Sequence, residues 1–194
     1  MNKFIKKLAV ILVIAALSIL CGLAAAHFAD RLDRARYPLK YTDLVEKYAE
    51  VYKVPRDICY AVIRTESGFD PTAVSGAGAI GLMQMMPAAF ADLTARTGDN
   101  YETGMLYDPE TSIRYGVCYL SMLYDRYGVW DTAFAAYNCG MGRVDGWIAE
   151  GRIDETGRLT DIPIEETRNY VERVNRAIEK YEKLYNTESM FESK

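Results

Sequence analysis

The residues best suited to chemistry lie in one run that begins at Glu66 and ends at Pro87. Glu66 closes an apolar helical segment, and a loop of small residues that includes Gly76, Gly78 and Gly81 follows it. The negative end of a helix dipole and apolar surroundings both disfavour a carboxylate. Both therefore raise the pKa of a carboxyl group toward the range that a general acid needs. The layout suits a lone acid beside a surface that binds a polymer.

Three methionines come after the loop, and we expect Met83, Met85 or Met86 to supply the apolar surroundings of the acid. A glutamate at the end of a helix, taken alone, is usually a solvated surface group. The assignment of Glu66 therefore depends on its neighbours.

The loop also matches the dinucleotide-binding pattern G-x-G-x-x-G between Gly76 and Gly81. That motif requires a strand before it and a long helix after it. Here a polar segment with Pro71 precedes the glycines, and Pro87 interrupts the segment after them. The pattern is therefore not a nucleotide site, and the glycines instead let the backbone come close to a bulky ligand.

Histidine and cysteine usage excludes several other mechanisms. The only histidine, His27, borders the apolar N-terminal segment, so neither a Ser–His or Cys–His pair nor a His-rich metal site fits the rest of the chain. Four cysteines are present: Cys21 in the N-terminal segment, and Cys59, Cys118 and Cys139 without metal-ligand spacing. We expect Cys59 and Cys118 to be small buried hydrophobes, and a disulfide among the last three is left open. No cofactor and no metal are expected.

The N-terminal segment predicts a membrane anchor. Leu8–Ala29 is apolar and long enough to cross a bilayer as a helix, and lysines precede it, which places the N-terminus in the cytoplasm. Cleavage near Ala24–Ala26, as in a signal peptide, is the alternative. The chain then divides into a cytoplasmic stub and anchor (1–29), a charged linker (30–40), one domain (41–185) and a C-terminal tail (186–194).

The elements that must position Glu66 read as helices. Apolar spacing, prolines and glycines predict helices at residues 41–52, 55–67, 87–97, 108–127, 130–138, 144–149 and 165–184, with Gly140 and Gly142 as breaks. The polar segment 150–163 predicts a loop or small hairpin. The fold class is therefore mainly α. A formal net charge of −4 gives no basic face for nucleic acid.

Four ordered blocks between Tyr41 and Leu184 resemble the lytic transglycosylases of the soluble-lytic-transglycosylase (SLT) type, which cut peptidoglycan glycan strands. The blocks are Glu66 to Pro87; Asp108-Pro109 with Ile113, Gly116, Tyr119 and Leu120; Ala135-Ala136-Tyr137-Asn138-Cys139-Gly140 with Gly142-Arg143-Val144; and Ile162-Pro163 with Glu166-Thr167-Arg168-Asn169-Tyr170-Val171. The clearest departure is Cys139, where the family usually has alanine.

The resemblance implies a lysozyme-like helical domain with at most a small β-hairpin, preceded by one transmembrane helix. Glu66 looks like the catalytic acid and base, and Tyr170 resembles the tyrosine that holds its carboxyl group. The remaining substrate-binding residues that the resemblance implies are Ser75, Gln84, Met86, Tyr137, Asn138 and Glu166. Glu166 either contacts the peptide stem or is purely structural, and Ser67 could brace the helix end.

The resemblance also implies a reaction. Glycosidases ordinarily use two carboxylates, with substrate-assisted families as exceptions, and the family resemblance supplies one. Glu66 would protonate the oxygen between MurNAc and GlcNAc, the MurNAc acetamido oxygen would stabilise C1, and Glu66 would then take the proton of the O6 hydroxyl as O6 attacks C1. The product carries a 1,6-anhydroMurNAc end.

Two other readings remain open from the sequence. Goose-type lysozymes have a similar fold and hydrolyse the same bond, and a degenerate module could bind cell-wall glycan without cutting it. The expected partners are peptidoglycan glycan strands and the membrane. The expected location is the bacterial cell membrane, single-pass, with the domain on the outer side; secretion after signal cleavage is the alternative.

Overall fold

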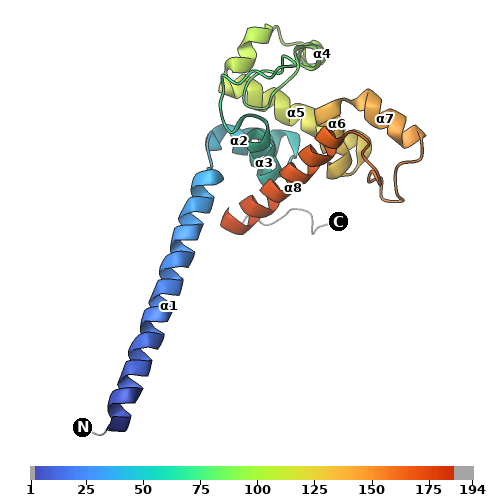
Figure 1. Cartoon of the computed structure of the whole chain (residues 1–194). Coiled ribbons are helices and arrows are strands. Elements are labelled where there is room, and N and C mark those ends of the chain that lie inside the picture. The colour runs from blue at the N-terminus through green and yellow to red at the C-terminus, as the bar shows by residue number, and fades with distance from the viewer. Residues whose placement is uncertain (1–2, 186–194) are drawn as a thin grey trace. The chain divides into compact units, whose positions relative to one another are not determined.

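The computed structural model describes residues 3–185, so the predicted tail at 186–194 lies outside the described residues. The chain forms two compact units, Met1–Pro38 and Leu39–Lys194. Figure 1 shows the first as one long helix and the second as a group of shorter helices.

The first unit is the helix α1 (Lys3–Arg36). Its stretch Val10–Arg36 is long and apolar enough to cross a membrane, and an 18-residue window within it has a mean hydropathy of 2.5. The helix continues through residues 30–36, which the sequence analysis assigned to the linker. An i,i+4 ion pair of 2.9 Å between Asp30 and Arg34 supports these turns. Pro38 disfavours helical backbone at the residue before it, which explains where the helix stops.

The regular elements in the described part of the second unit are all helices, joined by loops. Its elements are α2 (Thr42–Tyr52), α3 (Arg56–Ser67), α4 (Pro87–Thr97), the 3-10 helix η1 (Thr103–Tyr107), α5 (Pro109–Tyr127), α6 (Trp130–Cys139), α7 (Met141–Ala149) and α8 (Glu165–Tyr185). The mainly α class is confirmed.

Two local expectations need correction. The helix predicted from residue 144 begins at Met141, so Gly142 does not break it; a glycine inside a helix costs only roughly 0.5–1 kcal/mol in backbone entropy, which packing can offset. The 3-10 helix η1 was not predicted. In the segment 150–163 a single bridge joins Ile153 and Leu159, and no strand forms within the described residues.

The core is built around α3, whose residues Ile58 to Ile63 are all buried. Helix α8 packs along it in the opposite direction, because Tyr60 stacks on Tyr181 with ring centroids 5.5 Å apart while Glu66 meets Tyr170. An apolar stripe on α8, formed by Tyr170, Val171, Val174, Ala177 and Tyr181, faces the core.

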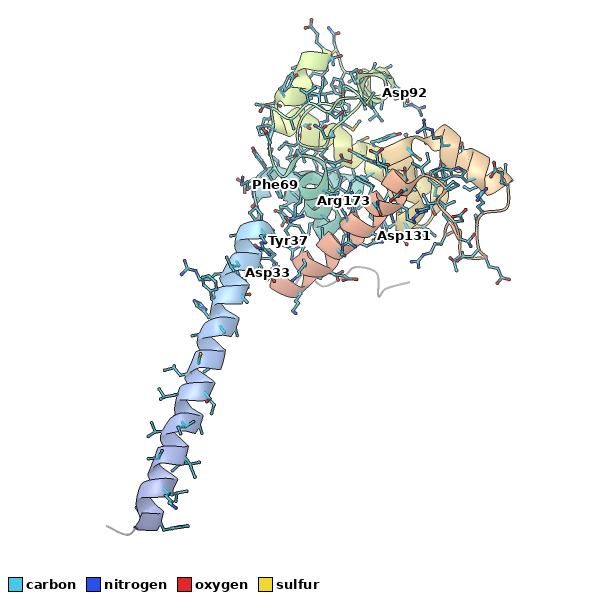
Figure 2. All side chains as sticks on the ribbon, in the orientation of Figure 1. Asp33, Tyr37, Phe69, Asp92, Asp131 and Arg173 are labelled. Carbon is cyan, nitrogen blue, oxygen red and sulfur yellow. The ribbon has the colours of Figure 1, made fainter. Side chains whose placement is uncertain are left out.

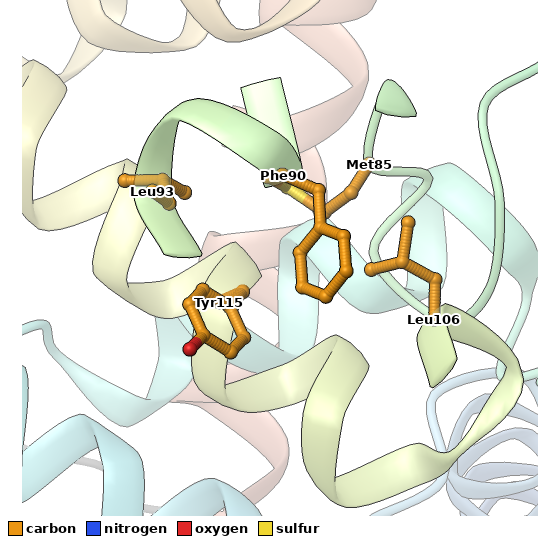
Figure 3. Close-up of a cluster of buried hydrophobic side chains, with 5 residues drawn as sticks. All are labelled: Met85, Phe90, Leu93, Leu106 and Tyr115. Carbon is orange, nitrogen blue, oxygen red and sulfur yellow. The ribbon is translucent and has the colours of Figure 1, made fainter. Parts of the chain in front are cut away.

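A second buried cluster fixes the chain beyond Glu66. Met85, Phe90, Leu93, Leu106 and Tyr115 pack together between α4, η1 and α5 (Figure 3). The Phe90 ring meets the Tyr115 ring edge-on, with centroids 4.9 Å apart. Through Met85, this cluster fixes the C-terminal end of the segment that follows the candidate acid.

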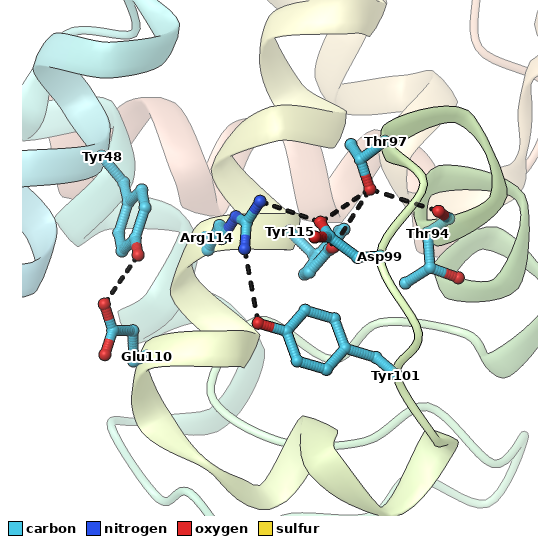
Figure 4. Close-up of polar contacts among 8 residues, drawn as sticks. All are labelled: Tyr48, Thr94, Thr97, Asp99, Tyr101, Glu110, Arg114 and Tyr115. Carbon is cyan, nitrogen blue, oxygen red and sulfur yellow. Dashed lines mark hydrogen bonds and ion pairs between the residues drawn. The ribbon is translucent and has the colours of Figure 1, made fainter.

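A polar network shares Tyr115 with this buried cluster. Asp99 accepts hydrogen bonds from the Tyr115 hydroxyl and from Arg114 Nη2, the latter at 2.8 Å, and Thr97 and Tyr101 join it (Figure 4). These contacts tie the connection after α4 to the first half of α5.

Of the two cysteines expected to be buried, Cys59 is buried and Cys118 is only partly buried. Cys59 is fully buried, and burial raises the pKa of its thiol. Cys118 and Cys139 are partly buried, and all three thiols are free. Cys59 therefore acts as a small core side chain.

Candidate active site

Helix α3 carries Glu66 in its last turn and stops directly after it. Gly68 adopts left-handed backbone with φ 61°, and its N–H bonds the Arg64 carbonyl, which ends the helix. The Ser67 hydroxyl donates to the Leu82 carbonyl at 2.7 Å and accepts from the Phe69 N–H at 3.1 Å. The helix end is thus braced against the segment that returns past the acid.

Tyr170 reaches Glu66 from α8. Its hydroxyl donates a hydrogen bond of 2.6 Å to Glu66 Oε1, and the tyrosine is 2% exposed. The hydrogen bond that the sequence analysis expected is therefore present. A buried ring leaves its hydroxyl little freedom, so Tyr170 fixes the direction of the carboxyl group.

The electrostatic environment of Glu66 favours its protonated form. Burial raises the pKa of Glu66 to about 7, while the Tyr170 hydrogen bond and the charge of Arg173 act in the opposite direction. The expected direction of the pKa shift is confirmed, with desolvation as its main cause. The side chain still keeps part of its surface open to solvent. Glu66 is therefore a carboxylic acid that an approaching ligand can reach and that titrates near neutrality.

Tyr137 lies on the α6 side of the site. Its hydroxyl donates to the Met83 carbonyl at 2.7 Å, and its ring packs on Tyr119 with centroids 5.4 Å apart. Burial and the charge of Glu66 both raise the pKa of Tyr137. The methionine segment and α6 are therefore joined beside the acid. Met83 is fully buried, as expected for a packing residue.

Asn138 and Glu166 occupy neighbouring positions on α6 and α8. The Thr167 hydroxyl donates to Asn138 Oδ1 at 2.8 Å, which ties the two helices together. Glu166 precedes Thr167 and is exposed. Asn138 thus has a structural bond, and Glu166 is open to solvent.

The loop after Glu66 is held by its own polar groups. Ser75 Oγ accepts from the Ala79 N–H at 3.0 Å. Gln84 Nε2 donates to the carbonyls of Ala73 and Gly81 at 3.0 and 2.9 Å. The nitrogen of Gln84 is therefore engaged within the loop, so a role in binding a ligand would fall to its amide oxygen. Met86 next to it is 43% exposed.

Asp70 does not resemble a second catalytic carboxylate. It is exposed and accepts from the backbone N–H and the hydroxyl of Thr72, at 2.8 and 2.7 Å. These hydrogen bonds hold the pKa of Asp70 below its usual range. Asp70 is an exposed carboxyl group in a turn whose pKa is lowered, whereas the pKa of Glu66 is raised. Within residues 3–185, no group of three or more His, Cys, Asp or Glu side chains is placed to hold a metal ion.

Comparison with known proteins decides the family. The model of the transglycosylase SLT domain matches residues 43–158, which include Glu66 and Tyr137. The chain belongs to the transglycosylase SLT domain family.

Relatives of this SLT domain include soluble and membrane-bound enzymes. It is 38% identical over 152 residues to the soluble lytic murein transglycosylase of Escherichia coli (strain K12), covering 75% of this chain and 23% of that protein. It is 35% identical over 166 residues to the membrane-bound lytic murein transglycosylase C of Actinobacillus pleuropneumoniae serotype 5b, covering 73% of this chain and 46% of that protein. The match thus spans only 23% to 46% of the length of these relatives.

Solved structures show the same fold. The 70 kDa soluble lytic transglycosylase from Escherichia coli superposes with a TM-score of 0.71 at 36% identity, covering 78% of this chain and 25% of that one. An inactive glutamate-to-glutamine mutant of lytic transglycosylase Slt from Pseudomonas aeruginosa gives 0.71 at 31% identity, covering 80% and 26%. The predicted SLT-type helical fold is therefore confirmed.

The structure of the SLT domain adds two residues that the sequence analysis did not select. Thr167 links α8 to Asn138, and Arg173 acts on both Glu66 and Tyr170 through its charge. Arg173 could have been found from spacing, because residues three apart on a helix share a face and Tyr170 was already a candidate. Thr167 carried no such signal, since its partner lies on another helix.

Proposed function

We propose that this SLT domain is a peptidoglycan lytic transglycosylase that cleaves the β-1,4 bond between MurNAc and GlcNAc. The observation that carries the proposal is Glu66, a reachable carboxyl group with a pKa of about 7 that Tyr170 holds in one direction. Membership of the SLT family supports it, as does the inactivity of the glutamate-to-glutamine mutant among the related structures.

In the proposed reaction, protonated Glu66 gives its proton to the glycosidic oxygen as the bond to C1 of MurNAc breaks. The acetamido oxygen of the same sugar stabilises C1 in place of a second carboxylate. The Glu66 carboxylate then accepts the proton of the O6 hydroxyl while O6 bonds to C1. Glu66 returns to its protonated state, no water is consumed, and the new end is 1,6-anhydroMurNAc. A pKa near 7 suits a group that must both give and take a proton.

The surrounding residues receive supporting roles in this proposal. Tyr170 orients the acid, and Tyr137 and Asn138 form the wall of the cleft. Ser75, the amide oxygen of Gln84 and exposed Met86 contact the saccharide. Glu166 contacts the peptide stem from its exposed position on α8. The partner is thus a peptidoglycan glycan strand, with its peptide near α8.

The proposed location is the bacterial cell membrane. We assign α1 as an uncleaved single-pass anchor with the SLT domain on the cell-wall side. The apolar stretch Val10–Arg36 and the kinship with a membrane-bound transglycosylase support this assignment. The orientation is inferred from the lysines that precede the span.

The mass of the released muropeptides tests the proposed reaction. Full-length protein in detergent is incubated with purified peptidoglycan, and the products are separated and weighed. Intramolecular attack by O6 gives products lighter by one water than those of hydrolysis. Products at the hydrolysed mass would instead make the domain a lysozyme-like hydrolase. Absence of cleavage together with retention of glycan strands would make it a binding module.

A further inference from the structure

Arg173 lies on the same face of α8 as Tyr170. Its guanidinium carbon is 5.9 Å from the centre of the Tyr170 ring, and the hydroxyl of that ring is 2.6 Å from Glu66 Oε1. Figure 2 labels Arg173 on α8. Tyr170 thus has a cation over the face of its ring and the candidate acid at its hydroxyl. A cation over an aromatic face is attracted by the ring, which gives Arg173 a preferred place.

Arg173 also differs from Arg176 on the same helix in its charge partners. Arg176, the next arginine on the helix, pairs with Glu172 at 3.4 Å. Arg173 is exposed and forms no ion pair among residues 3–185. Its charge is therefore not neutralised by a carboxylate of the described chain, and its field acts on the site.

The groups that act on the Glu66 carboxyl come from two helices. Tyr170 and Arg173 lie on α8 and Tyr137 on α6. Burial raises the pKa of both tyrosines well above the ordinary value, so their hydroxyls stay protonated at neutral pH. Of these three groups, Arg173 is the one that carries a charge.

We infer that Arg173, held over the face of the Tyr170 ring, is a positioning residue that acts on Glu66 through its charge and promotes release of the Glu66 proton to the glycosidic oxygen. This inference rests on the proposed function. Releasing the proton creates a carboxylate, which a nearby cation stabilises. Without Arg173, burial would raise the pKa of Glu66 further. Glu66 would then give up its proton less readily, and the acid step would slow.

Three variants separate charge from packing. Arg173→Gln removes the charge, Arg173→Lys keeps it, and Arg176→Gln removes a charge that Glu172 already neutralises. Two properties are measured on full-length protein in detergent: the titration of the Glu66 carboxyl by carbon NMR, and the rate against pH on soluble glycan strands.

We expect Arg173→Gln to raise the pKa of Glu66 by about half to one pH unit, as Coulomb interaction at partial exposure implies. The basic limb of the rate profile should move upward by the same amount, and the rate at pH 5 should fall about two- to tenfold. Arg173→Lys should restore both, and Arg176→Gln should change neither. Because an exposed charge is screened, about 1 M salt should move the wild-type titration toward that of Arg173→Gln.

An unmoved Glu66 titration in Arg173→Gln would overturn the inference, as would failure of Arg173→Lys to restore it. A higher KM with an unmoved titration would also overturn it, because Arg173 would then contact the substrate instead. The proposed function fails separately: wild-type protein that releases no anhydro product would refute it even where the titration shifts as expected.

Discussion

Tyr170 and Glu66 are 104 positions apart in sequence and share a hydrogen bond of 2.6 Å. Helices α3 and α8 run in opposite directions, so the last turn of one meets the first turns of the other. The contact pairs a donor that is itself fully packed with an acceptor that must change its protonation state. In the proposed reaction, the geometry therefore separates orientation, which Tyr170 would supply, from proton transfer, which Glu66 would perform.

Tyr170→Phe should reduce activity strongly and stability slightly. The ring stays packed while the hydroxyl is lost, and misdirecting a catalytic group can lower the rate on the order of 100-fold. A typical hydrogen bond contributes only about 0.5–1.5 kcal/mol to the free energy of unfolding. Turnover of peptidoglycan and chemical denaturation of the same preparation measure the two effects. Full activity in this variant would refute the orienting role.

Glu66→Gln should abolish cleavage and leave the fold intact. The amide has nearly the size of the carboxyl group but cannot donate and recover a proton, and one residue serves both steps. Release of soluble muropeptides measures the effect, and circular dichroism checks the fold. A rate above about a tenth of wild type would contradict the assignment, since general acid–base groups contribute about 100- to 10,000-fold.

The same variant should be more stable than wild type at alkaline pH. The pKa of Glu66 is about 7 in the folded state against an ordinary 4.5. The folded chain therefore binds more protons than the unfolded chain between these values, and stability falls as pH rises through this window. The shift corresponds to roughly 3 kcal/mol, lost by about pH 8. Chemical denaturation at pH 5 and pH 8 compares the two proteins, and equal pH dependence would rule out a buried, titrating Glu66.

Gly81→Ala should destabilise the loop beside the acid. Gly81 has φ +79°, and an added Cβ would lie 2.1 Å from the Leu106 carbonyl oxygen. Left-handed backbone with a side chain and overpacking together should cost about 2–4 kcal/mol. Gly76→Ala is the matched control, because nothing lies within 4 Å of its added Cβ. Thermal unfolding of both variants tests this, and equal melting temperatures would contradict it.

Removing residues 1–36 should release a soluble, folded and active domain. The described core, including the Tyr60–Tyr181 stack and the Glu66 site, lies wholly in the unit that begins at Leu39. Full-length protein should stay with membranes after a high-salt wash, whereas the shortened chain should not. Fractionation and N-terminal sequencing provide the measurement. Mature protein that begins near His27 in the soluble fraction would show that the anchor is cleaved.

The sequence alone determined most of the local structure and singled out Glu66 as the candidate acid. Proline, glycine and apolar spacing act over a few residues, so the bounds of α3, α4 and α5 could be read directly, as could the apolar character of α1. The single histidine removed the mechanisms that need a Ser–His or Cys–His pair or a His-rich metal site before any fold was known. The early start of α7 escaped because a glycine such as Gly142 is ambiguous between a break and a first turn.

Tertiary structure decided the pKa and the orientation of the candidate acid. The pKa of Glu66 depends on burial by segments far along the chain, and its orientation depends on Tyr170, so residues near it in sequence determine neither. The same holds for Gln84, whose amide nitrogen turned out to bind the loop's own carbonyls. Desolvation and hydrogen-bond geometry both depend on which groups are neighbours in space. Only the packing of α3 against α8 and α6 defines those neighbours.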